Sequence, residues 1–190
     1  MEKHYLFKAN KPIDQRYFFS ALEGIGIDKD QVIFSSPDQG EFFADSSAIA
    51  EIEPMIQLFH DDLSIQMSVL SAHQNTSFEQ ALLRKAALFF PNRVLYATDV
   101  IMKEISLGEF SSYKPLMNLF ANVPYELLNT AGTYLRCGCD ACLSARMLFI
   151  HRNTFNYRLN QFINLTGLDI RDYHNALLLE LYFQLNNSIR

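Results

Sequence analysis

Two hydrophobic patterns follow each other along the first hundred residues of the chain. Short apolar runs, some with every second residue apolar, predict strands, and apolar residues recurring at three- and four-residue intervals predict helices. From these patterns we expect strands at 4–8, 31–35, 41–44, 64–72 and 93–97. The intervening helices are expected at 13–23, from Ser46 or Ser47 as N-cap to about Phe59, and at 78–90 behind an N-cap at Thr76 or Ser77.

This order of elements predicts an α+β fold class for the first part of the chain, with helices packed on one sheet that contains antiparallel strands. A hairpin is expected between 31–35 and 41–44, because Pro37, Asp38 and Gly40 separate the two apolar runs. From residue 99 onward the strand patterns stop, and helices are expected at 99–105 and 115–121. We therefore divide the chain into an α+β domain at 1–110, a helical linker at 111–124 and an all-α domain at 125–190.

The all-α domain contains a helix-turn-helix pattern. Helices are expected at 125–136, from Asp140 or Cys142 to Met147, at 152–165 and at 173–185. Only the tight apolar connection 148–150 and one N-cap position, His151, separate the second of these helices from the third. Such a short turn between two helices is typical of proteins that place the second helix in the major groove of DNA.

The first turn of the 152–165 helix therefore supplies the candidate site. Arginine can pair with guanine and asparagine with adenine, so Arg152, Asn153 and Asn156 are predicted to read base edges. Thr154 and Arg158 are predicted to contact the DNA backbone, with a local cap and an acidic partner as their respective alternatives. His151 is predicted mainly as an N-cap and packing residue and is the sixth candidate contact.

The aromatic residues of this helix and those of the last helix have structural interpretations. Phe155 and Tyr157 are both predicted to lie in the core. The last helix is apolar around more than one face, which favours burial on two sides and, with the symmetry of helix-turn-helix proteins, a homodimer.

Composition narrows the class of protein. With 49% hydrophobic and 19% charged residues, the chain is expected to be globular rather than disordered. No apolar run approaches the roughly 18 residues needed to span a bilayer, and the N-terminus lacks a signal-peptide core, so we expect a cytoplasmic protein without a membrane partner. The net charge is −5, and all of the acidic excess lies in residues 1–123.

Three cysteines, Cys137, Cys139 and Cys142, form a cluster just before the helix-turn-helix. The cluster is open to three interpretations, which are a metal site, a redox sensor, and thiols that fill a turn. Tetrahedral zinc needs four ligands, and the nearest fourth candidates are Asp140 and His151, the second of which belongs to the helix-turn-helix pattern. We therefore expect neither a metal nor any other cofactor.

Several spaced blocks resemble a known family. Ala145–Thr154, Tyr157–Leu159 and Leu165–Asp169 together look like the C-terminal helix-turn-helix of PucR/CdaR-type bacterial transcription regulators, and 128–135 is similar to the preceding helix of that family. The resemblance implies a cytoplasmic, dimeric protein that binds double-stranded DNA. The chain leaves no room for the sensory domain of full-length relatives, so the resemblance names no small-molecule effector.

The first domain resembles the degenerate GGDEF-like domain that precedes this helix-turn-helix in many members of the family. The resemblance rests on the strand order, on 37–42 at the position of the cyclase signature, and on 77–81 and 94–96. It implies a ferredoxin-like β-α-β-β-α-β core. We expect no enzyme activity, because the signature turn keeps a single glycine, Gly40, and the segment 9–11 after the first strand has no metal-binding acid.

The sequence therefore predicts a sequence-specific DNA-binding transcriptional regulator whose recognition helix starts at Arg152. The alternative is an interaction module that does not bind DNA, such as a truncated paralogue that oligomerises with a full-length regulator. A positive stripe of Arg136, Arg146, Arg152 and Arg158 would favour DNA, and a broken stripe would favour the alternative. A third interpretation, a degenerate enzyme that still binds nucleotide, predicts stabilisation by nucleotide with metal.

Overall fold

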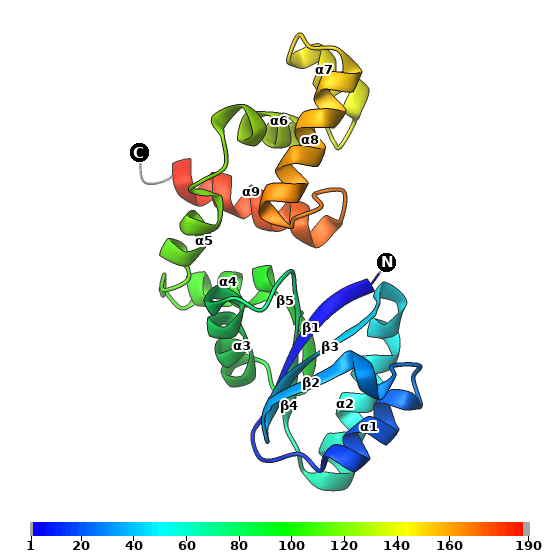
Figure 1. The fold of residues 1–190 in the computed structure, drawn as a ribbon. Coiled ribbons are helices and arrows are strands. Elements are labelled where there is room, and N and C mark those ends of the chain that lie inside the picture. Colours follow the sequence, from blue (N-terminus) through cyan, green and yellow to red (C-terminus); the bar gives the residue numbers. More distant parts are fainter. Residues whose placement is uncertain (1, 188–190) are drawn as a thin grey trace. The chain divides into compact units, whose positions relative to one another are not determined.

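The computed structural model describes residues 2–187 and has two compact units, Met1–Glu109 and Phe110–Arg190 (Figure 1). We call the first the sheet unit and the second the helical unit. The sheet unit combines strands and helices and the helical unit has only helices among its described elements, which confirms the α+β fold class. Each unit has its own buried apolar residues, so each is treated separately below.

The sheet unit contains the strands and helices in the predicted order. Its elements are β1 Glu2–Ala9, α1 Gln15–Glu23, β2 Val32–Ser36, β3 Gln39–Asp45, α2 Ile49–Leu63, β4 Met67–Ala72, α3 Ser77–Phe89, β5 Arg93–Tyr96 and α4 Ala97–Ser106. The strands form one sheet in the order β2-β3-β1-β4-β5. β1 is antiparallel to both β3 and β4, β2 is antiparallel to β3, and β5 is parallel to β4. The predicted hairpin is present, with Pro37 and Asp38 connecting β2 to β3, and Gly40 lies within β3.

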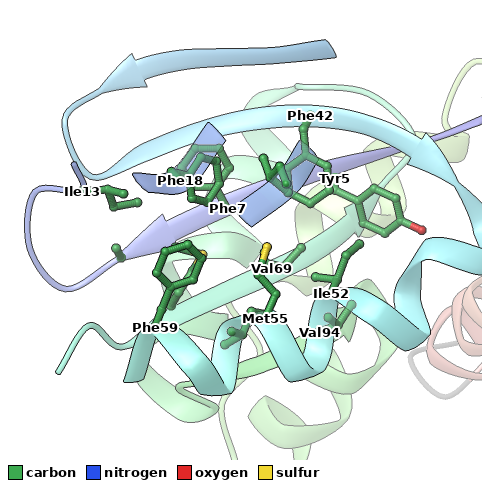
Figure 2. Close-up of a cluster of buried hydrophobic side chains, with 14 of the residues drawn as sticks. Tyr5, Phe7, Ile13, Phe18, Phe42, Ile52, Met55, Phe59, Val69 and Val94 are labelled. Atoms are coloured by element: carbon green, nitrogen blue, oxygen red, sulfur yellow. The ribbon is translucent and has the colours of Figure 1, made fainter. Parts of the chain in front are cut away.

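The core of the sheet unit lies between the sheet and the helices α1 and α2. Tyr5 and Phe7 of β1 point to the same face because side chains two residues apart in a strand share a face. There they pack with Phe18 of α1, Phe42 of β3 and Phe59 of α2, as Figure 2 shows. Helix α3 packs against β1 and β4, on the opposite face of the sheet from α1 and α2 (Figure 1). The order of elements thus produces a sheet with helices on both faces.

Two predicted boundaries around α2 are wrong. The N-cap of this helix is Ala48 rather than either predicted serine, because a 3-10 turn at Ser46–Ala48 leads into the helix, and no side-chain hydrogen bond caps its first turn. The helix also continues beyond Phe59 to Leu63, since the polar residues that follow do not break a helix, and it ends where Ser64 adopts a left-handed conformation. The strand predicted to start at Ser64 therefore starts at Met67.

The helical unit packs its helices around a smaller aromatic core. The helices are α5 Tyr113–Phe120, α6 Tyr125–Arg136, α7 Ala141–Met147, α8 Arg152–Thr166 and α9 Tyr173–Asn187. α5, in the segment expected as a linker, packs against α9. The ring of its Phe120 lies 4.4 Å from that of Tyr182 in α9 and 6.3 Å from that of Phe162 in α8, measured between centroids. α6 packs against both α8 and α9, and α7 packs against α8.

Candidate nucleic-acid interface

Local hydrogen bonds define the start of α7, the first helix of the helix-turn-helix. Asp140 is its N-cap, and its Oδ1 accepts the N–H groups of Cys142 at 2.8 Å and Leu143 at 2.9 Å. These two bonds to the ionised carboxylate hold the pKa of Asp140 below its usual value, and the positive charges of Arg146 and Arg152 lower it further. An aspartate at this position satisfies backbone donors that the helix itself leaves free.

The turn between α7 and α8 is as short as predicted. The N–H of Phe149 donates to the carbonyl of Arg146 at 3.1 Å, and the N–H of Ile150 donates to that of Ala145 at 3.0 Å, which ends α7. His151 is the N-cap of α8, because its Nδ1 accepts the N–H of Asn153 at 3.2 Å. Nδ1 must be unprotonated to accept this bond, so in the neutral ring Nε2 carries the hydrogen. The predicted capping role of His151 is thereby confirmed.

One face of α8 attaches the helix to the rest of the unit. Phe155, Leu159 and Phe162 are buried at three- and four-residue spacing, and the ring of Phe155 lies 5.8 Å from the ring of Tyr134 in α6. At its C-terminal end Gly167 takes the left-handed conformation that stops the helix. The buried stripe determines which residues of α8 face water, since positions about half a turn away lie on the opposite face.

The structure places the predicted contact residues at the exposed beginning of α8. His151, Arg152, Asn153, Thr154 and Asn156 are all exposed. Within residues 2–187, the side chains of Arg152, Asn153 and Asn156 make no hydrogen bond to the protein. Their donors and acceptors are therefore available to a partner, and they are brought together within the first two turns of one helix.

Arg158 has a different environment. It is partly buried, and its Nη2 lies 3.0 Å from Oε2 of Glu126 in α6. Of the two alternatives considered for Arg158, the structure shows the ion pair with an acidic residue. Arg136 is likewise engaged, since its Nη2 donates to Oγ1 of Thr133 at 2.9 Å. Of the four arginines expected to form a positive stripe, Arg136, Arg146 and Arg152 are exposed and Arg158 is partly buried.

The core assignment of Tyr157 is wrong. Its side chain is 62% exposed, whereas Phe155 is fully buried. The reason is helical geometry, because a residue two positions from Phe155 lies on the other side of the helix. Tyr157 shares the exposed face with Asn153 and Asn160, and its hydroxyl accepts from Nε2 of Gln161 at 2.9 Å. The spacing of the buried stripe was the signal that could have identified Tyr157 as a surface residue.

The cysteine cluster lies beside this surface. All three thiols are free, with Cys139 and Cys142 exposed and Cys137 partly buried. No group of three or more histidine, cysteine or acidic side chains in the described part of the chain is arranged to hold a metal ion. Over the same residues, no helix combines the length and the apolar character needed to cross a bilayer.

The short α7–α8 turn, the buried stripe of α8 and its exposed polar first turn define a helix-turn-helix domain. Residues 127–185 match the family described as the PucR C-terminal helix-turn-helix domain. This segment of the chain is therefore a PucR-type helix-turn-helix, as the sequence blocks predicted.

Two bacterial regulators are similar to about a third of this chain. The carbohydrate diacid regulator of Escherichia coli is 40% identical over 62 residues, which cover 33% of this chain and 16% of that protein. The proline-responsive transcriptional activator PutR of Bacillus subtilis is 41% identical over 56 residues, which cover 30% of this chain and 14% of that protein. The match thus spans less than a fifth of either relative.

A solved structure, the regulator of polyketide synthase expression from Bifidobacterium adolescentis, aligns with 99% of this chain and 82% of its own. Its TM-score is 0.46 and its sequence identity is 20%.

Proposed function

We propose that this chain is a transcriptional regulator that binds a specific double-stranded DNA sequence through α8. The carrying observation is the set of exposed side chains at the start of α8, Arg152, Asn153 and Asn156, which make no hydrogen bond within residues 2–187. Arg152 pairs with a guanine and the two asparagines read adenines in the major groove. The matched domain family and the regulators that share it support this function.

The neighbouring residues position α8 on the DNA. Thr154 contacts a backbone phosphate, because the local cap that it might otherwise supply is made by His151. His151 itself lies at the helix N-terminus, where the free N–H groups and the helix dipole favour a phosphate. Arg158 reaches the DNA backbone only after leaving Glu126, so its contribution is smaller than that of Arg152. Two copies of the chain bind two half-sites about 34 Å apart, as dimeric helix-turn-helix proteins do.

The sheet unit serves this regulator without catalysing a reaction, and its proposed origin is a degenerate GGDEF-like domain. A Cβ at Gly40 would lie 2.4 Å from the carbonyl oxygen of Ile33 and 2.7 Å from the Phe7 ring. This glycine is therefore needed for packing of the hairpin against β1, whereas a nucleotide site would need an open glycine-rich turn. The proposal of a non-catalytic unit rests on this packing and on the missing acid after β1.

The test is fluorescence anisotropy of the full chain on duplex DNA from the region upstream of its own gene, titrated with salt. Arg152→Ala should weaken specific binding by about 1–3 kcal/mol and relax the base preference at one position. Arg146→Ala is the matched phosphate variant, which should weaken all duplexes alike and reduce the salt slope by about one. Arg16→Ala removes an exposed arginine of the sheet unit and should change neither quantity.

One observation favours the alternative of an interaction module. Arg158 is paired with Glu126, which breaks the positive stripe at that position, and apart from Arg152 and Arg158 no residue of α8 is charged. In that case the folded protein binds no duplex even at low salt, and its association with a second chain is unaffected by Arg152→Ala. Salt-sensitive binding that Arg152→Ala reduces would exclude this alternative.

A further inference from the structure

Phe149, in the turn between α7 and α8, is an unusual surface residue. Its side chain is 96% exposed, the highest value among the large hydrophobic residues of the described chain. Its backbone is also left-handed, with a φ of 54°. The other described residues with positive φ are Gly26, Ser64, Asn92, Gly108, Gly138, Cys139 and Gly167, all of which are small or, in one case, an asparagine. Phe149 is therefore the one bulky apolar residue among them.

Both features are unfavourable for the chain alone. A fully exposed aromatic ring gives up the hydrophobic stabilisation that burial would bring. A left-handed backbone is strained for a bulky side chain, and glycine would adopt it freely. Within residues 2–187 the Phe149 ring has no aromatic ring contact that would compensate for its exposure. Strain that persists at such a position is typical of a residue that contacts a ligand.

The surroundings of Phe149 indicate which ligand. Arg146 precedes it by three residues, Arg152 follows it by three, and both are exposed cations. The turn leads directly into the residues at the start of α8 that the proposed function assigns to the major groove. A negatively charged partner would attract the two arginines, and an apolar group on that partner would bury the Phe149 ring. An apolar protein surface would offer these two arginines no opposite charge.

We propose that Phe149 contacts the C5-methyl group of a thymine at the edge of the half-site that α8 reads, and so determines specificity at that position. The thymine methyl is the one apolar group on the base edges of the major groove. The turn presents the ring beside the helix N-terminus, so the contacted base lies next to those read by Arg152 and Asn153. This inference rests on the proposed function, because it requires that α8 binds DNA.

The experiment combines one protein variant with one DNA change. Phe149→Gly removes the ring and the backbone strain together, so the variant should melt at a temperature equal to or above that of the natural chain. Replacing the contacted thymine by uracil removes only the methyl group. The natural chain should lose about fourfold in affinity on this change, the value of one buried methyl group. Phe149→Gly should bind the thymine duplex several-fold more weakly than the natural chain does. Its affinity should not change when the thymine is replaced by uracil.

Ser64→Gly is the matched control. Ser64 is also exposed and left-handed, with a φ of 51°, but it lies at the end of α2 in the sheet unit. This variant relieves strain of the same kind and should keep the full response to uracil. The thymine is found by changing each thymine of the bound duplex to uracil in turn.

The outcomes separate this inference from the proposed function. If the natural chain binds no DNA, the proposed function fails. If the natural chain binds DNA but Phe149→Gly binds with the same affinity, and responds in the same way to uracil at every thymine position, the contact does not exist. A uniform loss with an unchanged response to uracil would also overturn the thymine contact. Conversion of a dimer to a monomer by Phe149→Gly would assign the ring to a contact between two copies and overturn the inference.

Discussion

The sheet unit and the helical unit both contain many aromatic residues, but they place them differently. In the described part of the sheet unit, the most exposed ring among phenylalanines and tyrosines is that of Tyr17, at 36%. In the helical unit, Phe110, Tyr125, Phe149, Tyr157 and Tyr173 are all more exposed than that. The aromatic rings of the sheet unit stabilise that unit itself, whereas several rings of the helical unit are available to a partner.

Polar side chains show the same contrast. In the sheet unit, Glu41 of β3 is bonded to His4 of β1 at 2.9 Å and accepts from Asn75 at 2.6 Å. Nε2 of Gln39 in turn donates to Oε1 of Gln80 in α3 at 2.7 Å. On α8 the polar side chains of the first turn make no such bonds within the described residues. These polar side chains of the sheet unit are therefore bonded within their own unit, whereas those at the start of α8 are exposed to solvent.

The largest expected effect is the loss of stability when a buried aromatic ring is truncated, compared with truncation of an exposed ring. Phe7→Ala in the sheet unit and Phe155→Ala in the helical unit should each lower the free energy of unfolding of their own unit by about 3–5 kcal/mol. Tyr157→Ala should change it by no more than about 0.5 kcal/mol, because its ring is exposed, yet weaken DNA binding. Urea unfolding with amide hydrogen exchange measures each unit separately. A large loss of stability from Tyr157→Ala would contradict the placement of this ring on the exposed face of α8.

A second test compares one glycine from each unit. Gly40→Ala should destabilise the sheet unit by about 1–3 kcal/mol, because the new methyl group meets the backbone of Ile33 and the Phe7 ring. Gly132→Ala in α6 meets mainly the end of the Phe183 side chain, at 2.9 Å, which is partly exposed and can shift. Alanine also favours the helix by about 1 kcal/mol, so the two terms offset. Thermal unfolding of both variants checks the difference, and an equal loss of stability would show that the hairpin is not the tighter contact.

The elements whose hydrophobic periodicity and capping residues lie within their own segment could be predicted from the sequence. Period-two and period-3.6 patterns place the strands and helices, and local caps such as Asp140 and His151 act within three residues of themselves. For the same reason, the exposed residues at the start of α8 could be selected without a structure. These features depend on residues close together in the sequence, so a pattern within one segment is enough to predict them.

The features that could not be predicted depend on residues far apart in the chain. Arg158 pairs with Glu126, which belongs to another helix, so no pattern within α8 distinguishes an ion pair from a free cation. The connection 148–150 was expected to be tight and apolar, but the exposure of Phe149 depends on how α7 and α8 pack. Tyr157 is the exception, because its exposure follows from the local stripe, in which a residue two positions from the buried Phe155 lies on the opposite face of the helix.

The smallest expected effect is on the pH dependence of stability, which can be tested in each unit independently. Hydrogen bonds from the backbone of Leu143 and Cys142 lower the pKa of Asp140 in the helical unit. Hydrogen bonds from Ser36 and Lys8 lower the pKa of Asp38 in the sheet unit. A carboxyl group whose pKa is lower in the folded chain stabilises it fully above its ordinary pKa, near pH 4, and loses that contribution as the pH falls through the lowered value.

Asp140→Asn keeps a good N-cap residue and removes the titrating charge, so the acid sensitivity of the helical unit should decrease while the sheet unit is unchanged. Asp38→Asn should have the opposite selectivity. Because Asp140 also attracts Arg146 and Arg152, its replacement should strengthen DNA binding slightly, whereas Asp38→Asn should not. Hydrogen exchange between pH 3 and 7 and anisotropy near neutral pH test the two effects. If Asp140→Asn altered both units alike, the two units would not titrate independently, and the contrast between a self-contained unit and an outward-facing one would lose its basis.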